Sequence, residues 1–320
     1  MKLCEHPDFG QAITRAREHF GRTGLTEQLI EKDYYVTEAL RIVATAMPDQ
    51  VIFKGGTSLS KGWGLIERFS EDLDLFVNPQ SFAPPLSTRG IDRSLAGLRD
   101  MVGGHPGLWH DAEASQKLGG KGRSDYFMYR RQFAGAAAVA PRVLLEVGTS
   151  SGTYPTETRW ISSYVSDFLK ENGLTLGTDD EDGFEMPLLH FRRTFVEKMF
   201  AIHAKVEFMV RQGSPLRTFA RHYYDLYCLA QRPEVTEMLR SEEYAEIKQD
   251  YEHVSLASFP RGYVAPPEMR FANSQALFPP PDLRPTIAAD YEEQCRILCY
   301  GHYPPWDEVE QAFERLRPLI

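Results

Sequence analysis

Several features that the sequence lacks exclude whole classes of protein. Four cysteines stand in 320 residues without a CxxC pair, so neither a disulfide framework nor a zinc cluster is predicted. No apolar run approaches the roughly 20 residues that a membrane helix needs. Acidic residues at positions 5 and 8 do not fit a secretory signal. We therefore expect reduced thiols in a cytoplasmic protein that has no membrane partner.

Positive charge is also not in excess. Lys and Arg number 36 against 45 Asp and Glu, which gives a formal net charge of −9. Non-specific coating of nucleic acid depends on neutralising phosphates with Lys and Arg, so this balance argues against that role. The charge is nevertheless uneven, with basic residues gathered at 117–131 and 192–205 and acidic residues at 179–185 and 241–252. A local basic surface remains compatible with the acidic total.

The order of extended and helical patterns predicts an α/β part with a mixed sheet, followed by a mostly helical part. Strands are expected at 51–53, 73–77, 126–133 and 141–147. Helices are expected at 25–47, which Thr26 would cap, at 57–66 and at 91–102. Past about residue 155 the pattern changes to helix, with segments at 189–211, 216–230, 287–299 and 306–316. The boundary between the two parts is expected between 150 and 190.

Two aspartates and a glycine turn form the strongest pattern in the chain. Asp72 and Asp74 are two residues apart on an expected strand, so their side chains share one face. Mg²⁺ usually takes one or two carboxylates together with phosphate oxygens and water, which such a pair supplies. The turn at Gly55-Gly56 opens a short helix and offers backbone N–H groups to a triphosphate. Either element alone is common in ordinary strands and turns, whereas both in this order indicate metal-dependent phosphoryl chemistry.

A third carboxylate is expected from the strand 141–147. Glu146 interrupts this otherwise apolar segment, and burying a lone carboxylate is costly unless it is paired or bound to metal. Glu146 would then complete a two-metal site and act as general base for an incoming hydroxyl. The alternatives are a solvated face or an ion pair with an arginine.

The segments Lys54–Lys61 and Arg68–Leu75 resemble the polymerase-β-like nucleotidyltransferase superfamily and, more narrowly, the AbiEii/MenT family of toxin nucleotidyltransferases. Two further family motifs follow in the helical half, namely Glu197-Lys198 and the Arg-x-x-x-Asp-Leu-Tyr segment 221–227. The four motifs stand in the family's order and cover about residues 50–230.

The resemblance implies a polymerase-β-like domain at 1–170, with N-terminal helices, and a helical domain at 171–320 that contributes Lys198 and Asp225 to the cleft. The catalytic residues implied are Asp72, Asp74, Glu146, Lys198 and Asp225, the first three holding Mg²⁺ or Mn²⁺. The nucleotide-binding residues implied are Lys54, Gly55, Gly56, Thr57, Ser58, Ser60, Lys61, Ser70 and Arg221.

Some of these residues also have ordinary structural interpretations. Lys198 on a mostly apolar helix either extends to solvent or meets an anion. Arg221 and Asp225 have the i, i+4 spacing of an intrahelical ion pair. The segment 126–131 mixes aromatic and basic residues (Tyr126, Phe127, Tyr129, Arg130 and Arg131), which suits either a grip on single-stranded RNA or an exposed strand.

The family resemblance implies a toxin of a toxin–antitoxin or phage-defence system. Its expected reaction is transfer of NMP from an NTP to the 3′ end of RNA, with the tRNA acceptor end as the expected target and a block of translation as the result. A cognate antitoxin is the expected protein partner. The alternatives are a nucleotidyltransferase that modifies a protein hydroxyl or a small molecule, and an inactive nucleotide-binding module.

Overall fold

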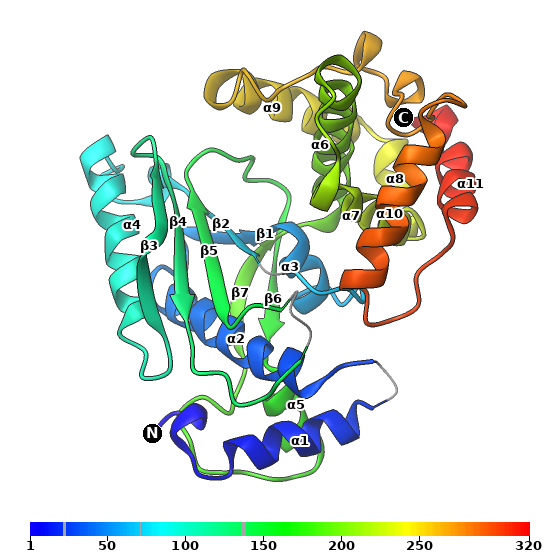
Figure 1. Ribbon diagram of the computed structural model, residues 1–320. Coiled ribbons are helices and arrows are strands. Elements are labelled where there is room, and N and C mark those ends of the chain that lie inside the picture. The colour runs from blue at the N-terminus through cyan, green and yellow to red at the C-terminus, as the bar shows by residue number, and fades with distance from the viewer. Residues whose placement is uncertain (22–23, 71, 136–138) are drawn as a thin grey trace. The chain divides into compact units, whose positions relative to one another are not determined.

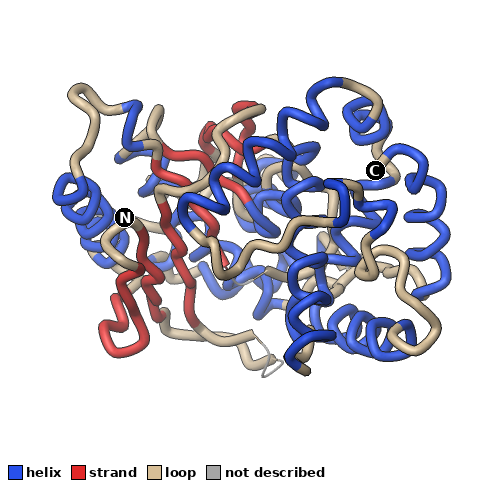
Figure 2. Tube along the Cα trace, turned by 90° about the horizontal axis from the view of Figure 1, so that it is seen from above, coloured by secondary structure: helices blue, strands red, loops and turns tan. Residues whose placement is uncertain are grey.

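A computed structural model describes residues 1–21, 24–70, 72–135 and 139–320 (Figure 1). Glu71 of the Asp-x-Asp segment and residues 136–138 of the Gly-Ala-rich stretch lie outside the described residues. The contacts divide the chain into two units. The first comprises 1–64, 69–149 and 156–189, and the second comprises 65–68, 150–155 and 190–320. Figure 2 shows the strands in red, and all of those described belong to the first unit.

The first unit is built on a seven-stranded mixed sheet with the order β3-β4-β5-β2-β1-β7-β6. Neighbours β2 and β5 run parallel, as do β1 and β7, and the remaining pairs are antiparallel. The strands are β1 (Val51–Lys54), β2 (Asp72–Val77), β3 (Trp109–Leu118), β4 (Gly122–Met128), β5 (Arg142–Gly148), β6 (Thr156–Ile161) and β7 (Phe184–Leu189). The predicted α/β class with a mixed sheet is confirmed.

Helices α2 (Glu27–Ala46) and α4 (Thr88–Gly103) cover one face of this sheet, α4 against β3 and β4 and α2 against β5 and β7. The apolar side chains that alternate along β2 and β5 point to this face and are buried, for example Leu73, Leu75 and Leu145. The alternate residues of the same strands consequently occupy the opposite face, where the candidate site lies. Thr26 caps α2 by accepting a hydrogen bond from the Leu29 N–H at 3.3 Å, as predicted.

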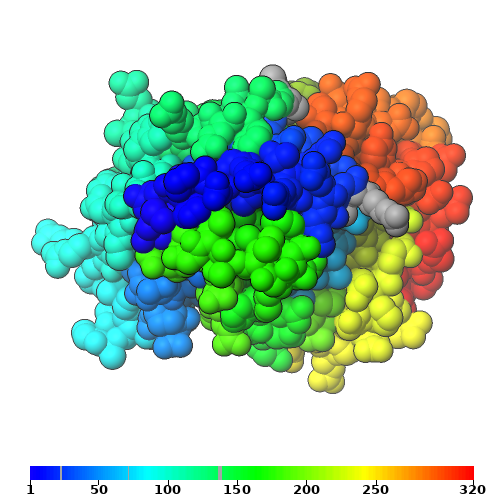
Figure 3. Space-filling model, turned by 90° about the horizontal axis from the view of Figure 1, so that it is seen from below, coloured from blue at the N-terminus to red at the C-terminus, as the bar shows by residue number. Residues whose placement is uncertain are grey.

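Helix α1 (Phe9–His19) packs beside α5 (Tyr164–Glu171) and against α2. Figure 3 shows α1 in dark blue lying over the green segment that contains α5. The ring of His19 contacts that of Phe168, and its Nε2 lies 2.7 Å from a carboxylate oxygen of Glu171. These contacts tie the start of the chain to the segment before β7.

The second unit consists of helices joined by loops. Its helices are α6 (Phe191–Gln212), α7 (Arg221–Ala230), α8 (Pro233–Leu239), α9 (Glu242–Ser258), α10 (Arg284–Leu298) and α11 (Trp306–Leu316). Aromatic rings fill its core: Phe200 stacks on Tyr251, and Tyr223 meets Trp306 edge to face. Among the described residues, no helix is long and apolar enough to cross a membrane.

Several sequence-based boundaries differ from the structure. Helix α3 spans Gly55–Lys61 rather than 57–66, and β4 spans Gly122–Met128 rather than 126–133. Past residue 155 the chain was expected to be helical, but it first forms β6 and β7. We expected the second domain to begin at 171, whereas the contacts place 171–189 in the first unit, because β7 pairs with β1 and β6.

Candidate active site

A row of polar side chains crosses the sheet on the face opposite α2 and α4. Lys54 on β1 pairs with Asp74 on β2, Asp74 pairs with Glu146 on β5, and Glu146 pairs with Ser124 on β4. Residues directly opposite each other on adjacent strands point to the same face, so these four side chains lie in one line. Asp72 precedes Asp74 by two residues and shares its face. The sheet therefore brings the three predicted carboxylates together.

The Glu146 carboxyl lies in an unfavourable electrostatic environment. Burial raises its pKa above the ordinary value, and the negative charges of Asp74 and Asp72 raise it further. The Ser124 hydroxyl donates a hydrogen bond to Oε1 at 3.3 Å, which together with the charge of Lys54 lowers the pKa. Three carboxylates on one sheet face therefore repel one another, and a bound cation would relieve that repulsion.

The glycine turn is shaped around the second aspartate. Gly55 follows β1 directly and has φ of +76°, a left-handed conformation that L side chains rarely adopt. A Cβ at this position would lie 1.9 Å from Oδ2 of Asp74. Glycine is therefore required at position 55 for two reasons, the backbone conformation and the close approach of the Asp74 carboxylate.

The hydroxyl groups of α3 hold the turn rather than point freely outward. Thr57 donates to the Asp72 carbonyl at 2.6 Å, and Ser58 donates to the Gly55 carbonyl at 2.9 Å. Both residues are buried. Ser60 donates to the Thr57 carbonyl at 3.2 Å. The Thr57 bond fixes α3 to the start of β2, whereas the bonds of Ser58 and Ser60 stay within α3.

Two other predicted nucleotide-binding residues are enclosed in the first unit. The Lys61 ammonium lies 2.6 Å from Oδ1 of Asp33 and donates to the Ser162 carbonyl at 2.7 Å. Its charge is therefore already balanced by Asp33. Ser70 is buried just before β2. Neither observation favours a direct contact with a phosphate.

The second unit contains a buried charge network centred on Asp225 of α7, which is 0% exposed. Arg68 binds it through two hydrogen bonds of 2.6 and 2.7 Å, one to each carboxylate oxygen. The Lys198 ammonium of α6 lies 2.7 Å from Oδ2 of Asp225 and 3.2 Å from Nδ1 of His222. Asp225 thus holds the Lys198 ammonium in place, while the cleft-facing role that the resemblance implies for it stays a prediction.

Burial and charge act in opposite directions within this network. Desolvation by burial works to raise the pKa of Asp225, but Arg68 and Lys198 hold it well below its ordinary value. Burial lowers the pKa of Lys198, as do the positive charges of Arg68 and Arg221, while Asp225 opposes this. Burial lowers the pKa of His222 to about 3, so this imidazole is neutral at pH 7.

The aromatic and basic segment 126–131 is divided between the two faces of the sheet. Phe127 and Tyr129 are buried, which excludes them from contact with a ligand on the open face. Tyr126 lies on the open face, where the guanidinium carbon of Arg142 is 4.6 Å from its ring centroid. Of the predicted aromatic residues, Tyr126 alone is placed to meet a ligand there.

A second acidic cluster in the first unit has the spacing of a metal site but not its chemistry. Glu38, His105 and Asp180 are buried, with potential ligand atoms within 4.8 Å of one another. Nδ1 of His105 accepts a hydrogen bond from the Gly107 N–H at 3.1 Å, so the neutral ring carries its proton on Nε2. Nε2 lies 3.8 Å from Oε2 of Glu38, and because it carries the proton it has no lone pair to offer a metal. Arg41 and Lys2 balance the Glu38 charge instead.

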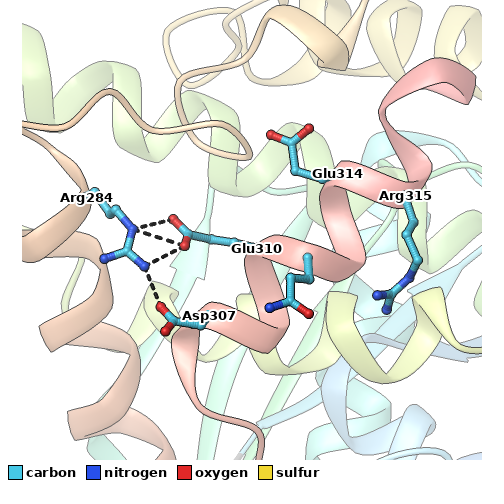
Figure 4. Close-up of a pocket in the computed structure, with 6 residues that line it drawn as sticks. Arg284, Asp307, Glu310, Glu314 and Arg315 are labelled. Atoms are coloured by element: carbon cyan, nitrogen blue, oxygen red, sulfur yellow. Dashed lines mark hydrogen bonds and ion pairs between the residues drawn. The ribbon is translucent and has the colours of Figure 1, made fainter.

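A surface cavity in the second unit also carries no chemistry that we assign. Its lining comprises Arg284, Asp307, Glu310, Gln311, Glu314 and Arg315 (Figure 4). Arg284 binds Glu310 and Asp307, so the charges pair with each other. Exposed pairs of this kind contribute little to stability or to binding.

Sequence reasoning missed two residues of these clusters. Arg68 stands beside Glu67 at the start of the Asp-x-Asp segment, where no local pattern distinguishes it from a surface cation. Ser124 gave no signal, since the serine hydroxyl becomes informative only when the register places it beside Glu146. The i, i+4 spacing of Arg221 and Asp225 left an intrahelical ion pair open beside a site role, and it did not reveal that Arg68 and Lys198 bind Asp225.

Comparison with known proteins gives one family and one solved structure. A comparison with curated proteins gives no match. The chain is similar to the solved structure of MenT4, a nucleotidyltransferase toxin from Mycobacterium tuberculosis H37Rv, with 18% identity, 92% of this chain and 99% of that chain covered, and a TM-score of 0.45. The family model described as nucleotidyl transferase AbiEii toxin, type IV TA system, matches residues 39–313. The chain therefore belongs to the AbiEii family of nucleotidyltransferase toxins of type IV toxin–antitoxin systems.

Proposed function

We propose that this toxin transfers NMP from an NTP to the 3′ end of RNA, with the tRNA acceptor end as its target. The observation that carries the proposal is the row of carboxylates on the open face of the sheet, next to a glycine turn shaped around one of them. Family membership supports the same chemistry. Extension of the acceptor end would block aminoacylation and so stop translation in the cytoplasm, and a cognate antitoxin would restrain the enzyme.

The donor set fits Mg²⁺, with Mn²⁺ as the alternative. Asp72, Asp74 and Glu146 offer only oxygen atoms, which are the ligands that hard divalent cations prefer. Burial raises the pKa of Glu146, and the negative charges of Asp74 and Asp72 raise it further; a cation at these residues would offset that charge. When bound, the metal supplies neutralisation of the triphosphate and lowers the pKa of the attacking hydroxyl.

The chain's own residues supply positioning and proton transfer. The Glu146 carboxylate accepts the proton of the RNA 3′-hydroxyl, whose oxygen bonds to the α-phosphorus as the bond to pyrophosphate breaks. Asp74, held against Gly55, keeps its place in the row. Within the second unit, Asp225 holds the Lys198 ammonium in place.

The test is transfer of label from each α-labelled NTP to total cellular RNA in the presence of Mg²⁺. Wild-type protein is expected to label a tRNA-sized band, and chelation by EDTA or the substitution Asp72→Ala should abolish the signal. Asp92→Ala is the matched control, since Asp92 lies on α4 and binds Lys117 at the surface. Transfer by folded Asp72→Ala protein would refute the site, and label on protein instead of RNA would refute the proposed acceptor.

A further inference from the structure

The open face of the sheet continues beyond the carboxylates to a stacked cation and ring. Glu146, Leu144 and Arg142 alternate along β5 and therefore share one face. Tyr126 pairs with Leu144 across β4 and β5, so it lies on that face too. The guanidinium carbon of Arg142 lies 4.6 Å from the centroid of the Tyr126 ring. The pair is a defined surface feature built on two adjacent strands.

This pair lies close to the carboxylates. Asp72 is paired with Leu144, and Arg142 is the next residue of β5 on the same face. Two residues of a strand span about 7 Å. The backbone of Arg142 therefore lies about 7 Å along β5 from the level of Asp72 and about 13 Å from Glu146, a span of one to two nucleotides. Both Arg142 and Tyr126 are half-buried, so each keeps part of its surface accessible.

Among the residues that the structure describes, no carboxylate forms an ion pair with Arg142. Its side chain contacts the Tyr126 ring instead. Because the guanidinium already lies over the Tyr126 ring, Arg142 has less conformational freedom left to lose when it binds a ligand, and its N–H groups remain available as donors. Such a fork matches the geometry of a phosphate. The exposed plane of the guanidinium or ring can also stack on a nucleobase.

The order of residues across the carboxylate row indicates which substrate Arg142 and Tyr126 would contact. Lys54 and Gly55, beside the aspartates, lie at the β1 end of the row. Glu146, the proposed base, lies on β5, so the hydroxyl that it deprotonates approaches from the β5 and β4 side. Arg142 and Tyr126 lie on those strands. Arg130 and Arg131 follow β4 and are exposed, which continues the positive charge in the same direction.

We propose that Arg142 and Tyr126 form the subsite for the 3′-terminal nucleotides of a single-stranded RNA acceptor, with Arg142 on a backbone phosphate and the stacked pair against an unpaired base. This inference rests on the proposed function, because it assigns the acceptor of the same site. The NTP is held by other residues, so the subsite distinguishes acceptor binding from nucleotide binding.

The experiment measures binding of a fluorescent single-stranded RNA octamer with a free 3′-hydroxyl, by anisotropy and without NTP. Arg142→Gln should weaken the affinity about tenfold and lower the salt dependence by about one phosphate contact. Tyr126→Leu should weaken it as well, through the lost stacking. The matched control is Arg99→Gln, which makes the same change on α4, where Arg99 binds Asp100.

Kinetics provide the second readout. In the transfer assay, Arg142→Gln should raise the KM for RNA and leave the KM for NTP unchanged. An RNA affinity equal to that of Arg99→Gln would overturn the subsite, and so would a variant that alters the KM for NTP instead. Failure of wild-type protein to bind the octamer would overturn it too. Failure of the proposed function is a different result, namely no Asp72-dependent label on any RNA.

Discussion

At the scale of single residues, Gly55 joins backbone geometry to the carboxylate row. Gly55→Ala would place a side chain in the left-handed region, which costs about 1–2 kcal/mol. The new Cβ would also displace the Asp74 carboxylate, which now lies 1.9 Å from that position. We therefore expect Gly55→Ala to lose stability in urea unfolding and to lose nucleotide transfer.

Gly64→Ala is the matched control for this substitution. Gly64 also has a positive φ, of +63°, but a Cβ there would meet no atom within 4 Å. It should show a similar conformational cost and keep its activity. Equal activity in the two variants would mean that the Asp74 position is not set by Gly55.

Glu146 gives a prediction about metal-linked stability. Its pKa is raised in the folded chain, so the unfolded chain releases its proton more easily and stability falls as pH rises through the folded value. In EDTA at pH 7, Glu146→Gln should therefore unfold at a higher temperature than wild type. Mg²⁺ should raise the melting temperature of wild type more than that of Glu146→Gln, because binding to the folded state stabilises it.

The measurement is thermal unfolding of both proteins with EDTA and with Mg²⁺. Ser124→Ala is a useful companion, since it removes the hydrogen bond to Glu146 without removing a carboxylate. It should keep the Mg²⁺ response. An identical Mg²⁺ shift in wild type and Glu146→Gln would remove Glu146 from the metal site.

At the scale of elements, α6 and α7 are joined through Asp225. Asp225→Ala would leave the buried charges of Arg68 and Lys198 without their carboxylate. Breaking a buried pair in this way costs about 3–5 kcal/mol. We expect a loss of this size in the free energy of unfolding of the second unit, measured by urea titration.

The control for Asp225→Ala is an ion pair on the exposed side of α6. Glu207 and Arg211 stand at i, i+4, with Arg211 59% exposed. Arg211→Ala, which truncates the exposed member of the pair, should cost only about 0.3–0.5 kcal/mol. Comparable losses in both variants would show that the Asp225 network is solvated and not buried.

The same elements show how far a sequence can predict this fold. Strands β1, β2 and β5 have clear apolar patterns because their inner faces are covered by helices, and all three were predicted. Strand β3 is largely exposed and has no apolar alternation, and β7 contains Pro187, which argues against a strand. In β4, Arg123 and Asp125 resemble loop residues but pair with each other under α4. Strands β3, β4 and β7 form because they pair with neighbouring strands in the folded chain, and their own sequences carry no clear strand pattern over their full length.

The residues of the candidate site likewise include some that the sequence indicates and some that it does not. The glycine turn and the two aspartates lie within residues 55–74, so their order and spacing indicate the site, and Glu146 stands out as a carboxylate in an apolar strand. Arg68 and Asp225 are separated by 157 residues, and no local pattern indicates that they meet. Thr57 and Lys61 were assigned to the nucleotide because a motif does not reveal hydrogen bonds made within the fold.

At the scale of the whole molecule, each unit holds a histidine that stays neutral at pH 7, His105 in the first unit, which is buried, and His222 in the second, whose side chain is 15% exposed. Burial lowers the pKa of His105 to about 4 and that of His222 to about 3. In the unfolded chain both should titrate near 6.5. Below about pH 6.5 the unfolded chain therefore binds protons that the folded units do not, and stability is lost as pH falls. The slope is about 1.4 kcal/mol per pH unit for each proton.

The test compares each variant with wild type, because carboxyls with raised pKa, such as Glu38, change stability in the opposite direction over part of the same range. His105→Gln should reduce the acid sensitivity of the first unit, and His222→Gln that of the second. The readout is urea unfolding from pH 7 to 4.5 followed by hydrogen exchange, which separates the two units. Relative to wild type, each variant should gain up to about 1.4 kcal/mol per pH unit on acidification in its own unit. Parallel curves for variant and wild type would mean that the imidazole binds its proton equally in both states and is not buried.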